Sequence, residues 1–111
     1  MEFAPFLTNW IDWLTDARKM SSHTVSAYVA DIQGFLAFQR EHCAQDLSVD
    51  DLSRLTLRDF RAWLAFRSKE GYEHRSTARA LSVVRSFYRF LMKHGYPVNT
   101  ALDSIRAPRV K

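Results

Sequence analysis

The residues from 74 to 95, HRSTARALSVVRSFYRFLMKHG, contain four arginines and one lysine but no aspartate or glutamate. Placed on a helix at about 100° per residue, these cations share one arc with serine hydroxyls, opposite an apolar arc. Arginine and serine donate hydrogen bonds to phosphate oxygens, and arginine can also donate two parallel hydrogen bonds to the edge of a guanine base. The chemistry of this arc is therefore that of a surface for a polyanion. The arc, hereafter the basic stripe, consists of Arg75, Arg79, Ser82, Arg85, Ser86, Arg89 and Lys93.

Two interpretations of the basic stripe are open. Most charged helix faces are simply solvated, but such faces gain about 0.2–0.5 kcal/mol from each pair of opposite charges at four-residue spacing. This helix instead repeats like charges at that spacing, as in Arg75 with Arg79 and Arg85 with Arg89. Phosphates would turn the repulsion into attraction, because each neutralised phosphate releases a condensed counterion. We favour nucleic-acid binding, and a helical module that binds an acidic protein is the alternative that the same arginines permit.

The charge of the whole chain is divided unevenly along its length. Residues 1–55 hold four Lys or Arg against eight Asp or Glu, whereas residues 56–111 hold twelve against four. A concentration of positive charge in one half of a chain is a hint of a polyanionic partner, although a weak one taken alone.

Composition favours a single helical domain. The chain has 111 residues, which is enough for one core, and only three glycines and three prolines, which is sparse for a fold with many β-turns. The one cysteine, Cys43, cannot form an internal disulfide, and with His42 beside it and no second ligand pair it predicts no metal site. We expect no cofactor. The N-terminus lacks a long apolar run, so we expect neither a signal peptide nor a membrane span. We therefore expect the protein to be cytoplasmic.

Apolar periodicity and capping residues predict an all-α bundle of four substantial helices with a short fifth helical turn at the C-terminus. Residues 43–55 between the second and third helices are predicted as a connection with Leu47, Leu52 and Leu55 turned inward. The predicted helices run from Pro5 to about Met20, from the capping segment SSHT to about Glu41, from the capping box of Thr56 and Asp59 to Gly71, and from the N-cap Ser76 to Gly95, with the last turn following the cap Asn99.

The second and fourth predicted helices each have a side that stays off the core. On the fourth helix this side is the basic stripe, and we expect Arg79 and Arg85 in its middle turns to be central and to be replaceable without loss of the fold. On the second helix it is a side of small residues that lets another helix or a ligand strand approach the backbone closely. These small residues are Ser26, Ala27, Ala30, Gly34 and Ala37.

Two segments carry a resemblance to a known family. The second helix, TVSAYVADIQGFLAF, resembles the T-x-x-x-Y-x-x-D-apolar-x-x-F-x-x-F pattern of the Xer-type tyrosine recombinases. Residues 75–91, RSTARALSVVRSFYRFL, are similar to the R-S-x-x-R-x-L-S-x-x-R-x-F-Y-x-F-L pattern of the same family, and LTLRDFRAWLAFR between them also fits. The resemblance covers nearly the whole chain, with one departure at Asn99-Thr100, where the family often has Asn-Pro. The matching positions in the second helix are Thr24, Tyr28, Asp31, Phe35 and Phe38.

The resemblance implies the N-terminal core-binding domain of such a recombinase, a SAM-like four-helix bundle that forms one jaw of a clamp around the recombination site. In that family the second and fourth helices face the DNA. The partners implied are double-stranded DNA and, when assembled on it, other recombinase subunits that the first helix is expected to contact; the isolated domain is expected to be a monomer. The implied DNA-contacting residues are Ser22, His23, Thr24, Ser26, Arg75, Ser76, Arg79, Ser82, Arg85, Ser86 and Arg89.

The resemblance implies no catalysis in this chain. In the family, strand exchange belongs to a separate C-terminal domain with a nucleophilic tyrosine and a cluster of basic residues around the phosphate. The phenols of Tyr28 and Tyr88 lie on predicted core faces and no such cluster accompanies them. We therefore expect residues 1–105 to be the DNA-binding domain and residues 106–111 to begin a linker to a catalytic domain.

Overall fold

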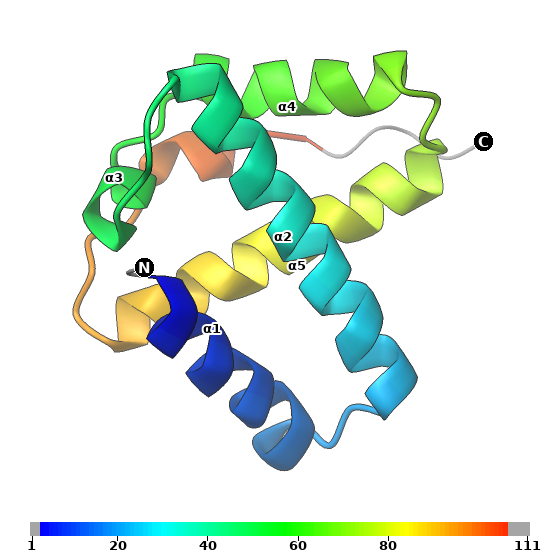
Figure 1. The fold of residues 1–111 in the computed structure, drawn as a ribbon, viewed down its shortest axis with the longest axis vertical. Coiled ribbons are helices and arrows are strands. Elements are labelled where there is room, and N and C mark those ends of the chain that lie inside the picture. Colours follow the sequence, from blue (N-terminus) through cyan, green and yellow to red (C-terminus); the bar gives the residue numbers. More distant parts are fainter. Residues whose placement is uncertain (1–2, 107–111) are drawn as a thin grey trace.

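A computed structural model describes residues 3–106 as a bundle of helices, and no β-strand occurs within these residues (Figure 1). The all-α fold and the short C-terminal turn predicted from the sequence are confirmed. The four longer helices are α1 (Phe3–Asp12), α2 (Ser22–Cys43), α4 (Leu57–Lys69) and α5 (His74–Lys93), and the shorter elements are the π-helix η1 (Trp13–Ala17), α3 (Val49–Ser53) and the 3₁₀-helix η2 (Thr100–Ser104).

The first predicted helix is divided in two. It leaves α-helical geometry after Asp12 and continues as the π-helix η1, and its end is marked by Lys19 in the left-handed region with φ 56°. Trp10 and Leu14 are fully buried on its inner side. A π-turn holds one more residue than an α-turn, and over five residues the two cannot be told apart by apolar spacing. The sequence therefore predicted the helical segment but missed the change of geometry.

The segment between α2 and α4, which was predicted as a connection, contains the short helix α3. Ser48 and Asp51 form a capping box, in which the Asp51 N–H donates to Ser48 Oγ at 3.1 Å and the Ser48 N–H donates to Asp51 Oδ2 at 2.8 Å. The inward placement of Leu47, Leu52 and Leu55 is confirmed, since all three are buried. The Ser-x-x-Asp signal was present in the sequence, but five residues are too few to show helical periodicity.

Two buried polar side chains join α3 to the C-terminal half of the chain. Tyr88 of α5 donates its hydroxyl to the Leu52 carbonyl at 2.7 Å. Asn99 donates from Nδ2 to the carbonyls of Leu52 and Leu55 at 3.1 and 3.0 Å. Asn99 Oδ1 also accepts from the Ala101 N–H at 3.0 Å, so the predicted cap of the last turn is confirmed.

The predicted start of the fourth long helix was wrong. The helix begins at His74 after Glu73, which has an extended backbone with φ −68° and ψ 152°, so Ser76 lies inside the first turn instead of capping it. Its hydroxyl accepts from Arg67 Nη2 at 3.1 Å. The capping box of Thr56 and Asp59 at the start of α4 is confirmed.

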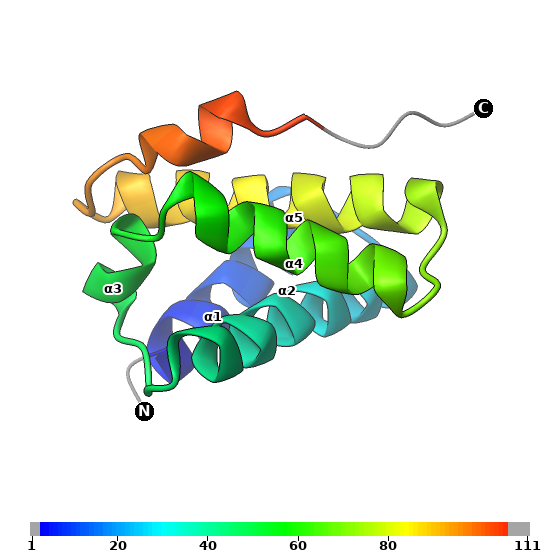
Figure 2. The ribbon, with the colours of Figure 1, turned by 90° about the horizontal axis from the view of Figure 1, so that it is seen from above.

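Helix α5 lies at the centre of the fold. Figure 2 shows it between α1 and α2 on one side and η2 on the other, with α2 crossing it in Figure 1. No helix in the described part of the chain is both long and apolar enough to cross a membrane. The predicted apolar side of α5 is buried except for Met92, which is 44% exposed, and the buried apolar residues of this helix are Ala80, Leu81, Val83, Val84, Phe87, Tyr88, Phe90 and Leu91.

Candidate nucleic-acid interface

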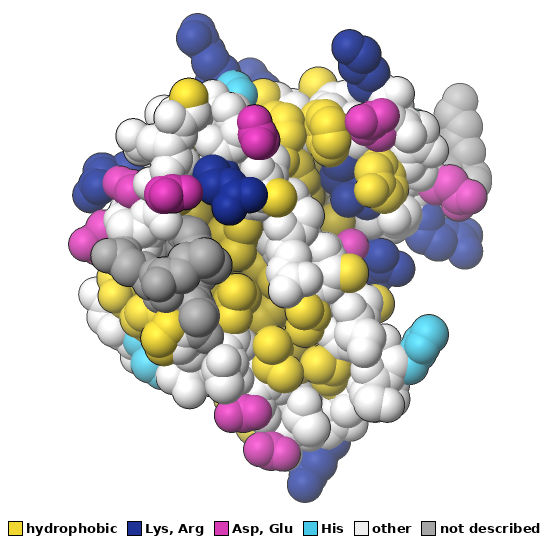
Figure 3. Space-filling model, in the orientation of Figure 1, with side chains coloured by type: hydrophobic (Ala, Val, Ile, Leu, Met, Phe, Trp, Pro, Cys, Tyr) yellow, Lys and Arg dark blue, Asp and Glu magenta, His cyan; other side chains and the backbone are white. Residues whose placement is uncertain are grey.

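Small and uncharged side chains form the outward face of α2. Ser22, His23 and Ser26 are exposed, whereas Thr24 is half-buried and its hydroxyl accepts from Ser21 Oγ at 3.0 Å at the start of the helix. A Cβ added to Gly34 would meet no atom within 4 Å, so the backbone there is open. Ala30 and Ala37 are also exposed, and Ala27 is half-buried. Figure 3 shows hydrophobic side chains and uncharged white surface over the lower middle of the molecule in this view, with dark blue cations above them and toward the rim.

Three exposed residues of α5 form an unpaired line along the helix. Arg75, Ser82 and Arg89 recur every seven residues and therefore lie on one side of it. None of the three makes a hydrogen bond or ion pair with another described residue. We call Arg75, Ser82 and Arg89 the free line. The donors of its two guanidinium groups are therefore not used by any described residue.

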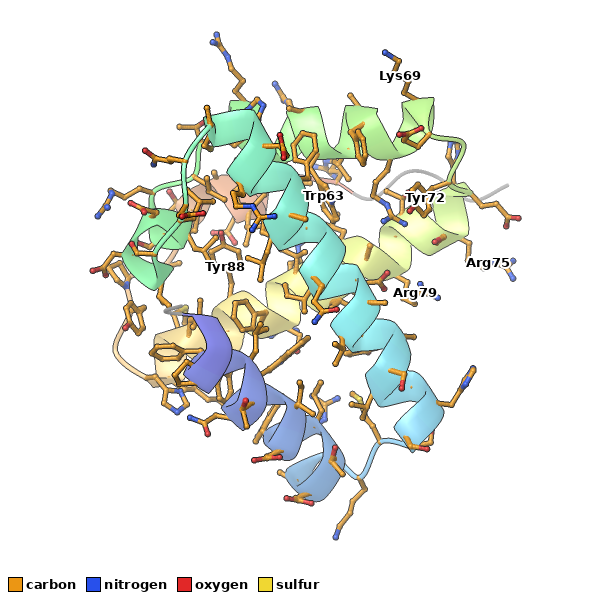
Figure 4. All side chains as sticks on the ribbon, viewed as in Figure 1. Trp63, Lys69, Tyr72, Arg75, Arg79 and Tyr88 are labelled. Carbon is orange, nitrogen blue, oxygen red and sulfur yellow. The ribbon has the colours of Figure 1, made fainter. Side chains whose placement is uncertain are left out.

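Arg79 is instead engaged with α2. Its Nε donates to Asp31 Oδ2 at 2.9 Å and its Nη2 donates to Asp31 Oδ1 at 3.2 Å. Asp31 is only 8% exposed, and the Arg79 side chain is 50% exposed. The hydrogen bonds that Arg79 donates to the Asp31 carboxylate raise the pKa of Arg79 above its ordinary value. This bidentate pair fixes the crossing of α2 and α5, where Figure 4 shows Arg79 between the two helices.

Arg85 is engaged with the C-terminal turn. Its Nη2 donates to the carbonyl of Leu102 at 3.3 Å and to the carbonyl of Ile105, and the side chain is half-buried. The Leu102 carbonyl also accepts from the Ile105 N–H at 3.2 Å, and Ile105 is the residue that follows the last residue of η2. Arg85 therefore supplies donors to carbonyls at and just before the end of this helix. The basic stripe predicted a solvent-facing Arg85, so its part in packing, like that of Arg79, is a finding of the structure.

The remaining predicted residues of α5 are divided between the surface and the interior. Ser86 is only 9% exposed, and Ser76 is half-buried against Arg67, so neither hydroxyl is presented openly to solvent. Lys93 is exposed, with its Nζ 5.2 Å from the centroid of the Trp13 ring. A helical wheel gives only the angle of each residue around the helix axis. It could not predict that neighbouring elements cover both edges of the basic stripe.

Arg67 is a residue of this region that the sequence analysis did not single out. It comes from the last turn of α4, is 6% exposed, and donates from Nε to Thr77 Oγ1 at 3.0 Å as well as to Ser76. Its position in the segment LTLRDFRAWLAFR, four residues after the buried Trp63, was the available signal, since that spacing places both on one face of the helix.

A model of one domain family matches most of the chain. The family described as "Phage integrase, N-terminal SAM-like domain" matches residues 7–95, which include α2, α4, α5 and the Arg79–Asp31 pair. The chain belongs to the phage integrase N-terminal SAM-like domain family. The resemblance read from the two sequence patterns is thereby confirmed.

The relatives of this SAM-like domain include proteins named tyrosine recombinase XerC. The chain is 40% identical over 108 residues to the one from Rhodospirillum centenum, covering 97% of this chain and 32% of that protein. It is 37% identical to the one from Methylobacterium sp. and 38% identical to the one from Methylobacterium nodulans, each over 105 residues, covering 95% and 92% of this chain. The chain therefore spans about a third of the length of these curated relatives, 32% and 31% for the two Methylobacterium proteins. No solved structure matches it.

Two of the four tyrosines of the SAM-like domain, Tyr28 and Tyr88, pack against other residues of the bundle. Tyr88 is buried, and this burial is the main cause that raises the pKa of its phenol far above the ordinary value. Tyr28 is half-buried, with its ring stacked on Trp10 at a centroid distance of 6.3 Å.

Residues 3–106 contain no group of three or more His, Cys, Asp or Glu that could hold a metal ion. The linker predicted from residue 106 lies, apart from Arg106 itself, outside the described residues.

Proposed function

We propose that the chain is the DNA-binding clamp domain of a site-specific tyrosine recombinase. In this proposal residues 1–105 encircle and position the recombination site together with the rest of the parent protein, residues from 106 onward lead to a separate catalytic domain, and that domain performs strand exchange in the cytoplasm. Other recombinase subunits bound to the same DNA are its protein partners. The family and the XerC relatives support this assignment.

The observation that carries the proposal is the free line of α5. Two guanidinium groups and a hydroxyl stand exposed along one side of a helix whose remaining arginines are held by the protein. Asp31 of α2 pairs with Arg79, whereas no described acidic residue pairs with Arg75 or Arg89. Phosphate oxygens of duplex DNA would accept hydrogen bonds from Arg75 and Arg89 and would balance their positive charge.

The outward face of α2 supplies the second half of the proposed interface. It carries no charged side chain from Ser22 to Ala37 apart from the buried Asp31, so it does not repel a phosphate backbone. Its small residues and the open Gly34 backbone permit a close approach of the groove edge. Ser22, His23 and Ser26 are exposed and can donate hydrogen bonds there.

A salt titration tests the proposed function. The domain is mixed with a labelled duplex at several salt concentrations and the association constant K is measured. With Arg79 and Arg85 held by the protein, the remaining cations of α5 are Arg75, Arg89 and Lys93. About three phosphates are then neutralised, and log K should fall against log salt with a slope of about −3. A flat response would reject the DNA interface, and binding to an acidic protein at the same arginines would then replace it.

A further inference from the structure

Arg67 is a buried cation that has no carboxylate partner among the described residues. Its guanidinium is held by two neutral hydroxyls, those of Thr77 at 3.0 Å and Ser76 at 3.1 Å. Two aromatic rings complete its surroundings, with the Arg67 Cζ 4.0 Å from the centroid of Tyr72 and 5.8 Å from that of Trp63. The carboxylate that acts on it electrostatically, Asp31, is already bonded to Arg79.

This arrangement is costly, so it calls for a reason. Burial of a charge without a countercharge opposes folding, and desolvation accordingly lowers the pKa of Arg67 below its ordinary value. An apolar side chain of similar volume would avoid that cost and still pack against Trp63. What only arginine offers is a planar fork that bridges two hydroxyls while its faces stack on aromatic rings.

The two hydroxyls that Arg67 bridges belong to a helix end that lacks a side-chain cap. Glu73 occupies the N-cap position of α5 without a capping hydrogen bond from its side chain. The chain enters this end through a tight turn at Gly71, whose φ is +85°. Arg67 therefore ties the first turn of α5 to the last turn of α4, at a place where the helix has no cap of its own.

The tied turn is also the one from which the N-terminal cations of α5 project. Ser76 and Thr77 lie between Arg75 and Arg79, and Figure 4 shows Arg75 pointing away from the bundle at this end of α5. We propose that Arg67 is a positioning residue, which holds the first turn of α5 so that Arg75 meets DNA without a further cost of ordering. The inference rests on the proposed function.

The experiment compares charge-conserving and charge-removing variants of the same residue. Arg67→Lys keeps the charge but a single ammonium cannot reproduce the planar fork, whereas Arg67→Met removes both. Each variant is titrated with the duplex at several salt concentrations, at a temperature where circular dichroism shows it folded. Arg58→Lys on the same helix is the matched control, because Arg58 is exposed and makes no hydrogen bond or ion pair with another described residue.

For both Arg67 variants we expect K to fall about three- to tenfold at fixed salt, which is the cost of immobilising one or two side chains. The salt slope should stay that of the wild type, because the same phosphates are neutralised. Hydrogen exchange at the amides of residues 75–77 should quicken while that of residues 83–91 does not. Arg58→Lys should bind like the wild type.

Two outcomes would overturn the inference, and a third would reject the proposed function on which it rests. If folded Arg67 variants bind DNA as tightly as the wild type, Arg67 serves stability alone. If Arg67→Met lowers the magnitude of the slope by about one while Arg67→Lys does not, Arg67 is itself a phosphate ligand. If the wild-type domain shows no salt-dependent binding, the proposed function fails, and the exchange measurement still reports whether Arg67 holds the turn.

Discussion

Two pairs of arginines on α5 share one helical stripe and differ in what surrounds them. Arg75 and Arg89 of the free line are exposed and unpaired within the described region, whereas Arg79 is bonded to Asp31 and Arg85 to the carbonyls of Leu102 and Ile105. The engaged pair lies at the two edges of the stripe, where α2 and η2 approach. Position on a helix therefore decides only which arginines can reach solvent, and the neighbouring elements decide which of them stay free for a ligand.

The largest expected effect is on stability at Arg79. Replacing Arg79 by alanine leaves the Asp31 carboxylate 8% exposed without its bidentate partner, so the free energy of unfolding should fall by about 2 kcal/mol. Arg75→Ala should change it by less than about 0.5 kcal/mol, because that side chain contacts nothing it would leave unsatisfied. Urea denaturation followed by circular dichroism measures both. Equal stabilities of the two variants would remove the distinction between engaged and free arginines.

A smaller loss is expected at Arg85. Arg85 is half-buried and its partners are the neutral carbonyls of the buried residues Leu102 and Ile105, so Arg85→Ala should lower the free energy of unfolding by about 1 kcal/mol. The change should be local, so limited proteolysis should cut the variant sooner after residue 99 than the wild type. Ser82→Ala, on the exposed side of the same helix, is the control and should be cut at the wild-type rate.

Asp31→Asn should convert an engaged arginine into a free one. The amide cannot neutralise Arg79, whose side chain is already 50% exposed, so the guanidinium becomes available to phosphate. We expect a steeper salt slope for duplex binding, by about one unit, together with a lower stability. A slope equal to that of the wild type would mean that Arg79 does not face the DNA even when released.

We expect neither the wild-type chain nor any of these variants to cleave DNA or to attach covalently to it. The phenol of Tyr88 is buried with a raised pKa and bonded to Leu52, and a nucleophile needs the opposite conditions. Incubation with a nicked suicide substrate, followed by denaturing electrophoresis, should show no covalent protein–DNA band. Such a band would contradict the assignment of strand exchange to a separate domain.

The sequence predicted the helices and the core well because both depend on local spacing. The capping box of Thr56 with Asp59, the cap Asn99 and the buried arc of α5 all follow from residues within one or two turns of each other. The site was harder to predict because its state depends on residues far apart in the chain. Nothing near Arg79 in the sequence indicates Asp31, which precedes it by 48 positions, and nothing near Arg85 indicates the Ile105 carbonyl.

The errors at helix ends have a similar origin. Ser76 has the chemistry of an N-cap, but the helix begins two residues earlier at His74, and the Ser76 hydroxyl accepts from Arg67 of α4 instead. The short helix α3 was missed because its stability comes from buried contacts and from Tyr88 and Asn99 rather than from its own five residues.

The central claim, that the free line of α5 is the part of the stripe that meets DNA, is tested most directly by removing its two cations together. Arg75→Ala combined with Arg89→Ala should fold with wild-type stability, and the slope of log K against log salt should become shallower by about two units. Arg58→Ala combined with Arg61→Ala, which removes the same charge from exposed positions of α4, should leave that slope close to the wild-type value. A wild-type slope in the α5 double variant, or an equal loss in the α4 double variant, would contradict the claim.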